Sequence, residues 1–141
     1  MIIDQLSVFC ENKAGMLAEI AENLADAGID IEALTIADTT DFGVLRFIVD
    51  SPKKALSILK MNGFAAQVTP VIALRMKNEP GSLARIVRAL ADEGISIEYL
   101  YACVAGDSDS AFVILRVEDM ENAKTALTEK GYEAYRNTSG V

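Results

Sequence analysis

The segments NKAGMLA (residues 12–18) and AGIDIEAL (residues 27–34) return further along the chain as NEPGSLA (residues 78–84) and EGISIEYL (residues 93–100). The offset is 66 residues throughout, from position 12 to position 78, and 13 of the 23 aligned positions are identical. A repeat of this length indicates one structural unit of about seventy residues that occurs twice. We therefore expect two units, residues 1–69 and residues 70–141.

Each repeat has the same predicted order of elements. Alternating apolar residues predict strands, and apolar residues at i, i+3, i+4 and i+7 predict helices. The strands are expected at 2–9, 29–37, 43–50 and after Phe64, and again at 71–77, 95–104, 111–118 and after Tyr132; the helices are expected after Gly15, at 52–62, after Gly81 and at 120–130. The apolar pattern of 29–37 and of 95–104 slips phase early in the strand, which indicates a bulge on an edge strand.

This order, βαββαβ twice, predicts an α+β fold of two ferredoxin-like units. In each unit an antiparallel sheet carries both helices on one face. Residues 68–72 join the two repeats without a flexible linker, so we expect the units to form one rigid body.

Composition excludes several kinds of function. The chain contains no His, and Cys10 and Cys103 lie at unmatched places in the two repeats, so neither a metal-ligand cluster nor a His-based triad is expected. The net charge of −8 and the 6% aromatic content argue against a nucleic-acid partner. No apolar run could span a bilayer. We expect a cytoplasmic protein with reduced thiols, no cofactor, no metal and no catalytic residue.

The loop before the first helix of each repeat is the candidate for function. It reads Asn-x-Ala/Pro-Gly-x-Leu, and its Gly stands where a helix begins with free N–H groups and a partial positive charge. Such a terminus suits a carboxylate, and the Asn both donates and accepts hydrogen bonds. The alternative is that Asn and Gly only make a turn. Both interpretations stay open from the residues alone.

The repeated loop, together with ADEGISI (residues 91–97), resembles the ACT domain family of small βαββαβ regulatory modules. The resemblance covers essentially the whole chain as a tandem pair. It implies side-by-side pairing that joins two four-stranded sheets into one of eight. It also implies an amino acid bound at the interface of two units, between the Gly loop of one and the start of the second strand of the other.

Carried onto this sequence, the resemblance implies two sets of ligand contacts. The loop contacts are Asn12, Lys13, Ala14, Gly15, Met16 and Leu17 in the first repeat and Asn78, Glu79, Pro80, Gly81, Ser82 and Leu83 in the second; the strand contacts are Asp30, Ile31, Ser96 and Ile97. Ala14 departs from the Pro that is usual in the family, and Asp30 and Ser96 replace a frequent Asn. The two sites are therefore not expected to be equivalent.

Two functions follow from these expectations. The first is a stand-alone regulatory module that senses a free amino acid and acts allosterically on an enzyme. The second is an assembly subunit that uses the pairing surface and leaves the pocket unused. Because sheet edges tend to be covered, either protein is expected to be a homodimer or larger.

Overall fold

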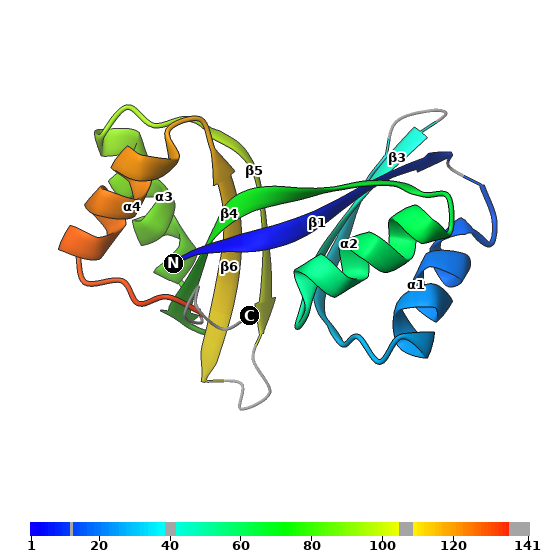
Figure 1. Cartoon of the computed structure of the whole chain (residues 1–141). Coiled ribbons are helices and arrows are strands. Elements are labelled where there is room, and N and C mark those ends of the chain that lie inside the picture. The colour runs from blue at the N-terminus through cyan, green and yellow to red at the C-terminus, as the bar shows by residue number, and fades with distance from the viewer. Residues whose placement is uncertain (12, 39–41, 105–108, 136–141) are drawn as a thin grey trace. The chain divides into compact units, whose positions relative to one another are not determined.

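The computed structural model describes residues 1–11, 13–38, 42–104 and 109–135. The elements are β1 (Ile2–Glu11), α1 (Met16–Asp26), β2 (Ile31–Asp38), β3 (Phe42–Val49), α2 (Pro52–Met61), β4 (Ala65–Lys77), α3 (Ser82–Asp92), β5 (Ile97–Val104), β6 (Ser110–Val117) and α4 (Met120–Glu129) (Figure 1). Contacts divide the chain into two compact units. Asp4–Thr69 form the N-terminal unit, and Met1–Ile3 with the chain from Pro70 onward form the C-terminal unit. No described helix is both long enough and apolar enough to cross a membrane.

The strands are antiparallel and are hydrogen-bonded in the order β2-β3-β1-β4-β6-β5. In the N-terminal unit this gives β4-β1-β3-β2, the strand order of a βαββαβ ferredoxin-like unit. In the C-terminal unit β4, β6 and β5 take the places of β1, β3 and β2. The α+β fold and the βαββαβ pattern predicted from the repeats are therefore confirmed.

The core of the N-terminal unit lies between its sheet and its two helices. Leu6 and Val8 of β1 and Phe47 of β3 are fully buried, and all belong to one apolar cluster with Ile20 of α1 and Leu59 of α2. Alternate residues of a strand point to opposite faces, so one cluster that includes both helices places them on the same face of the sheet. Figure 1 shows α1 and α2 side by side.

The C-terminal unit repeats this core. Ile72 and Leu74 of β4 and Leu115 of β6 are fully buried against Ile86 of α3 and Leu127 of α4. The apolar stripes predicted for the helices are the buried faces in both units. Each stripe is followed by a left-handed glycine, for example Gly94, whose φ of 70° favours a residue without a Cβ.

The predicted bulges are present on both edge strands. The pairing of β2 with β3 shifts between Ile31 and Ala33, and the pairing of β5 with β6 shifts between Ile97 and Tyr99. The two shifts lie 66 residues apart, so the repeat preserves the irregularity as well as the regular elements.

The joint between the repeats is a strand instead of a loop. The expected last strand of the first repeat and the first strand of the second merge into β4, which runs for 13 residues through Pro70. The expected sheet of eight strands is therefore wrong, and the described residues form six.

Only the beginning of the strand expected after Tyr132 falls within the described residues. There it makes one bridge, between Leu74 and Ala134. Part of its place beside β4 is taken by the start of β1, where the carbonyl of Met1 accepts from the N–H of Ala73 at 2.8 Å. Residues Met1–Ile3 therefore group with the C-terminal unit, whereas the rest of β1 belongs to the N-terminal unit.

We expect Phe47→Ala to lower the free energy of unfolding by about 3–5 kcal/mol, because it empties a fully buried aromatic site. The control is Phe42→Ala on the same strand, where the side chain is 62% exposed and a loss of about 1 kcal/mol or less is expected. Urea denaturation followed by circular dichroism measures both. Equal losses in the two variants would contradict the placement of the core.

Candidate ligand site

The two glycine loops have the same backbone conformation. Gly15 precedes α1 with φ 86° and ψ −13°, and Gly81 precedes α3 with φ 91° and ψ −13°. Both values lie in the left-handed region, where a Cβ is strained. The turn therefore favours glycine in both repeats, whatever else the loop does, with Asn and Asp the side chains that tolerate this φ best.

Backbone hydrogen bonds tie the two loops in the same way. The N–H of Met16 donates to the carbonyl of Lys13 at 3.3 Å, and the N–H of Ser82 donates to the carbonyl of Glu79, also at 3.3 Å. Each loop thus places a helix N-terminus, with its partial positive charge, at the same point of its unit. The geometry is compatible with a carboxylate at either terminus.

The side chains of the two loops differ. In the first loop, Lys13, Ala14 and Gly15 are exposed, whereas Met16 and Leu17 pack against the core of the N-terminal unit. Asn12 lies outside the described residues. The first loop therefore presents mainly backbone and the Lys13 ammonium, which is 3.6 Å from a carboxylate oxygen of Glu11.

The second loop is held by an arginine that the sequence analysis did not single out. Arg85 of α3 reaches back over the helix N-terminus and donates to Glu79 Oε1 at 3.2 Å and to Ser82 Oγ at 3.3 Å. A Cβ added at Gly81 would lie 3.1 Å from Arg85 Nη1. Asn78, Glu79, Pro80 and Gly81 are exposed, and the N–H of Asn78 donates to the carbonyl of Asp109 at 3.0 Å.

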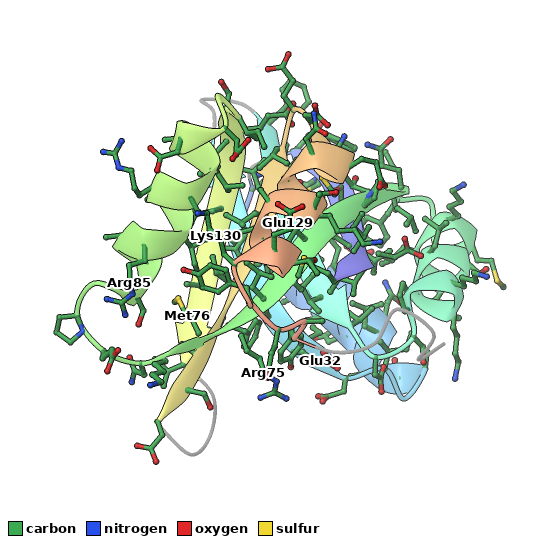
Figure 2. All side chains as sticks on the ribbon, turned by 90° about the vertical axis from the view of Figure 1, so that its left-hand side faces the viewer. Glu32, Arg75, Met76, Arg85, Glu129 and Lys130 are labelled. Carbon is green, nitrogen blue, oxygen red and sulfur yellow. The ribbon has the colours of Figure 1, made fainter. Side chains whose placement is uncertain are left out.

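The helix terminus behind this loop is partly buried. Ser82 is 6% exposed, and Leu83 is the more open of the two at 37%. Figure 2 shows Arg85 on α3 and Met76 on β4 close to this terminus. The second loop is therefore more tightly tied to its surroundings than the first.

The strand contacts lie far from the loop of their own unit. Asp30 and Ile31 follow the C-terminus of α1, and Ser96 and Ile97 follow the C-terminus of α3. Each helix has 11 residues and is about 16 Å long. One small ligand therefore cannot touch the loop and the strand start of a single unit.

These strand residues also have structural roles. The N–H of Asp30 donates to Asp50 Oδ1 at 3.1 Å, and the carbonyl of Ser96 accepts from the N–H of Glu118 at 3.3 Å. Ile31 and Ile97 are half-buried and pack against the two cores. The exposed side chains of Asp30 and Ser96 are the ones open to a ligand.

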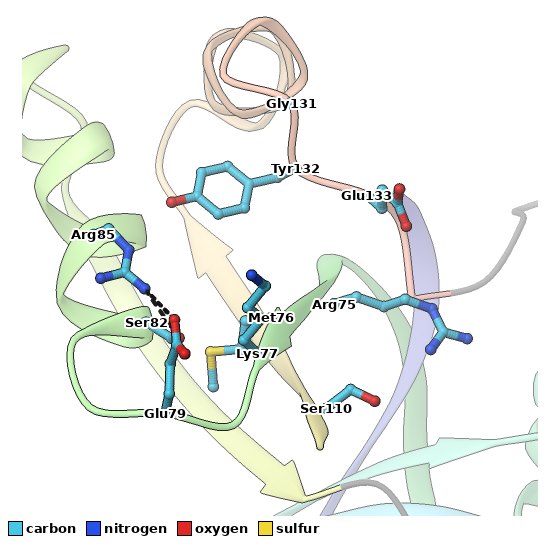
Figure 3. Close-up of a pocket in the computed structure, with 10 residues that line it drawn as sticks. All are labelled: Arg75, Met76, Lys77, Glu79, Ser82, Arg85, Ser110, Gly131, Tyr132 and Glu133. Atoms are coloured by element: carbon cyan, nitrogen blue, oxygen red, sulfur yellow. Dashed lines mark hydrogen bonds and ion pairs between the residues drawn. The ribbon is translucent and has the colours of Figure 1, made fainter. Parts of the chain in front are cut away.

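The second loop forms one wall of a cavity inside the C-terminal unit (Figure 3). The cavity has a volume of about 530 Å³, within the range of small-molecule sites. Its lining residues are Arg75, Met76, Lys77, Glu79, Ser82, Arg85, Ser110, Gly131, Tyr132 and Glu133. Of these, only Glu79 and Ser82 belong to the predicted ligand contacts.

The described residues contain no group of three or more His, Cys, Asp or Glu side chains able to hold a metal ion. A carboxylate oxygen of Glu98 on β5 lies 3.5 Å from the Nε of Arg116 on β6. Arg116 also donates to the carbonyl of Pro70 at 2.7 Å. This pair therefore braces β4 against the edge of its sheet.

Two repeated βαββαβ units, each with a left-handed glycine at the start of its first helix, define a tandem ferredoxin-like fold. Comparison with family models identifies it as an ACT domain pair over residues 1–138. The chain belongs to the ACT family.

Solved structures share this fold. Protein BT0572 from Bacteroides thetaiotaomicron is 42% identical, with a TM-score of 0.89 over 94% of this chain and 91% of that one. The ligand-free regulatory subunit of aspartate kinase from Thermus thermophilus is 21% identical, with a TM-score of 0.67 over 91% of this chain and 92% of its own. At that identity the second likeness shows the fold alone. Comparison with the curated proteins gives no match.

Both cysteines are free and half-buried, and burial raises the pKa of the Cys10 and Cys103 thiols. A raised pKa lowers the thiolate fraction at pH 8, and the thiolate is the reactive form. We therefore expect iodoacetamide to alkylate the folded protein more slowly than free cysteine at pH 8, with a rate that rises as the pH approaches 10. Protein unfolded in urea is the control and should react like free cysteine. A folded thiol that reacts faster than free cysteine at pH 7 would contradict this.

Proposed function

We propose that this ACT domain pair is a stand-alone regulatory module that binds a free amino acid at its glycine loops and controls an enzyme allosterically. The observation that supports it is the duplicated helix N-terminus behind a left-handed glycine. Two units keep the same φ and ψ at Gly15 and Gly81 although their loop side chains differ. A backbone N–H cluster suits the one group that every amino acid shares, its carboxylate.

The ligand contacts predicted on β2 and β5 belong to this proposal as well. Because a strand start lies at the far end of the helix from its own loop, a ligand held by both sets must draw them from two different units. Asp30 and Ser96 then offer an acceptor for the ligand amine. Asp30 is an anion and Ser96 is neutral, so the two sites differ in charge and in affinity.

The proposal assigns regulation to this chain and catalysis to another protein. The aspartate kinase relative is described as a regulatory subunit, which supports an enzyme as the partner. The free thiols fit a reducing compartment, and we place the protein in the cytoplasm. A thermal-shift screen of the twenty amino acids identifies the ligand, since a ligand at 100 times its Kd stabilises the folded state by about 2.7 kcal/mol.

We expect Gly81→Asp to weaken binding of the amino acid found in that screen by more than about tenfold, because it adds a negative charge beside the carboxylate. The matched control is Gly81→Asn, which has the same shape, the same tolerance of a left-handed φ and the same approach to Arg85. Calorimetric titration of folded variants measures the affinities.

Asn should retain most of the affinity that Asp removes. If both variants bind like the unmodified protein, as do the same changes at Gly15, then the loops are turns only. Equal loss in the Asp and Asn variants would show that shape, rather than charge, decides binding. That result would contradict the placement of the carboxylate.

One observation favours assembly as a second role. β2 and β5 are the edges of the described sheet, and both expose large apolar side chains on the face that carries the helices. On β2, Ile36 is 50% exposed; on β5, Val104 is 60% exposed. Unpaired edges with apolar side chains favour pairing with another chain, so we propose a homodimer or larger assembly.

Light scattering should therefore give at least twice the 15.2 kDa of one chain. Ile36→Lys and Val104→Lys together should shift the mass toward that of the monomer, because a charge at an edge opposes pairing. Met61→Lys is the control: Met61 is 81% exposed at the end of α2 and belongs to neither edge strand. A monomer at high concentration would defeat the assembly proposal.

A further inference from the structure

Three charged residues line the cavity of the C-terminal unit at positions where the N-terminal unit carries the opposite charge. Lys77 at the end of β4 and Arg85 on α3 correspond, at the 66-residue offset, to Glu11 and Glu19. Glu79 corresponds to Lys13. Three positions that share one fold have thus exchanged sign, so the fold does not require these charges. A function specific to the C-terminal unit accounts for them better.

The cations are placed to act together. Figure 3 shows Lys77 and Tyr132 pointing into the space that Arg85 borders, whereas the guanidinium of Arg75 points away from it. The Lys77 ammonium has no hydrogen bond or ion pair with any described residue. Glu79 and Glu133 also line the cavity, so its three cations, with Arg75 included, exceed its carboxylates by one, and this balance favours an anion.

Arg85 already holds a carboxylate, that of Glu79. The pair spans 3.2 Å with both side chains half exposed, at 58% and 50%, so it is weak and exchangeable. An incoming carboxylate that reaches both Arg85 and Lys77 has two charged donors. Glu79 is paired with Arg85 alone. Met76 and Tyr132 provide apolar surface for the remainder of the molecule.

We propose that this cavity binds a small organic carboxylate. Lys77 and Arg85 pair with the carboxylate of the ligand, which displaces the Glu79 side chain from Arg85. The site lies wholly within one unit and uses side chains, whereas the amino-acid site proposed above uses loop backbone and a second unit. It does not depend on that proposal. No α-amino group is required, because the argument rests on the carboxylate alone.

Succinate, a dicarboxylate without an amino group, is the probe. Titration of the 15N-labelled full chain should shift the amides of the lining residues. Lys77→Gln should weaken succinate binding by about tenfold, the usual effect of losing one charge-assisted hydrogen bond. Glu79→Gln should tighten it by about threefold or more, since Arg85 is then released from its competitor. All these side chains are exposed, so the variants should fold, and the amide spectrum verifies it.

Lys53→Gln is the matched control, because it removes the same charge from an exposed position on α2 of the other unit. It should leave succinate affinity within about twofold. Inorganic phosphate at equal ionic strength should bind more weakly, as it has no apolar body for Met76 and Tyr132. The proposal is overturned if succinate shifts no lining amide, if Lys53→Gln weakens binding as much as Lys77→Gln, if Glu79→Gln fails to tighten it, or if phosphate binds better. Gly81→Asp adds a carboxylate beside Arg85 and so affects both proposals; the same change at Gly15, in the other unit, bears on amino-acid binding alone.

Discussion

Both units depend on the backbone pairing of β4, which runs unbroken through Pro70. Its first five residues complete the N-terminal sheet, and its remaining residues form the inner strand of the C-terminal one. Pro70 has no N–H to donate, yet its carbonyl is held by Arg116 at 2.7 Å. Because a half-strand cannot satisfy its hydrogen bonds alone, the order of each sheet depends on the same segment of chain. The start of β1 reinforces this, since Met1 bonds to Ala73.

On this scaffold the duplicated loop keeps its backbone and changes its chemistry. Gly15 and Gly81 differ by only 5° in φ, because each makes the same turn from the first strand of its repeat, β1 or β4, into the helix that follows. The residues around them carry opposite charges in the two units. A duplicated regulatory module can diverge in this way, since side chains on an open loop change specificity without cost to the buried cores.

The two classes of ligand proposed for this ACT pair differ in whether the backbone or the side chains bind them. Backbone N–H groups at a helix start recognise a carboxylate whatever side chain it is attached to. The side chains of Lys77 and Arg85 are proposed to recognise an anion in the C-terminal unit, where the matching positions of the N-terminal unit are Glu11 and Glu19. In this proposal an acidic protein gathers cations at one cavity, and the anion bound there need not carry an α-amino group.

The sequence by itself determined the repeat, the order of elements, the buried helix stripes, the left-handed glycines and the two bulges. These follow from local periodicity and from backbone conformations that only certain residues adopt. Residue patterns could not show that two predicted strands merge into β4, since periodicity is the same for one long strand and for two short ones. Nor could they show that the start of β1 takes part of the place of an eighth strand. Only the tertiary structure brought Tyr132 to Arg85 and Lys77, because these residues lie about fifty positions apart and meet through the packing of α3 and α4 on one sheet.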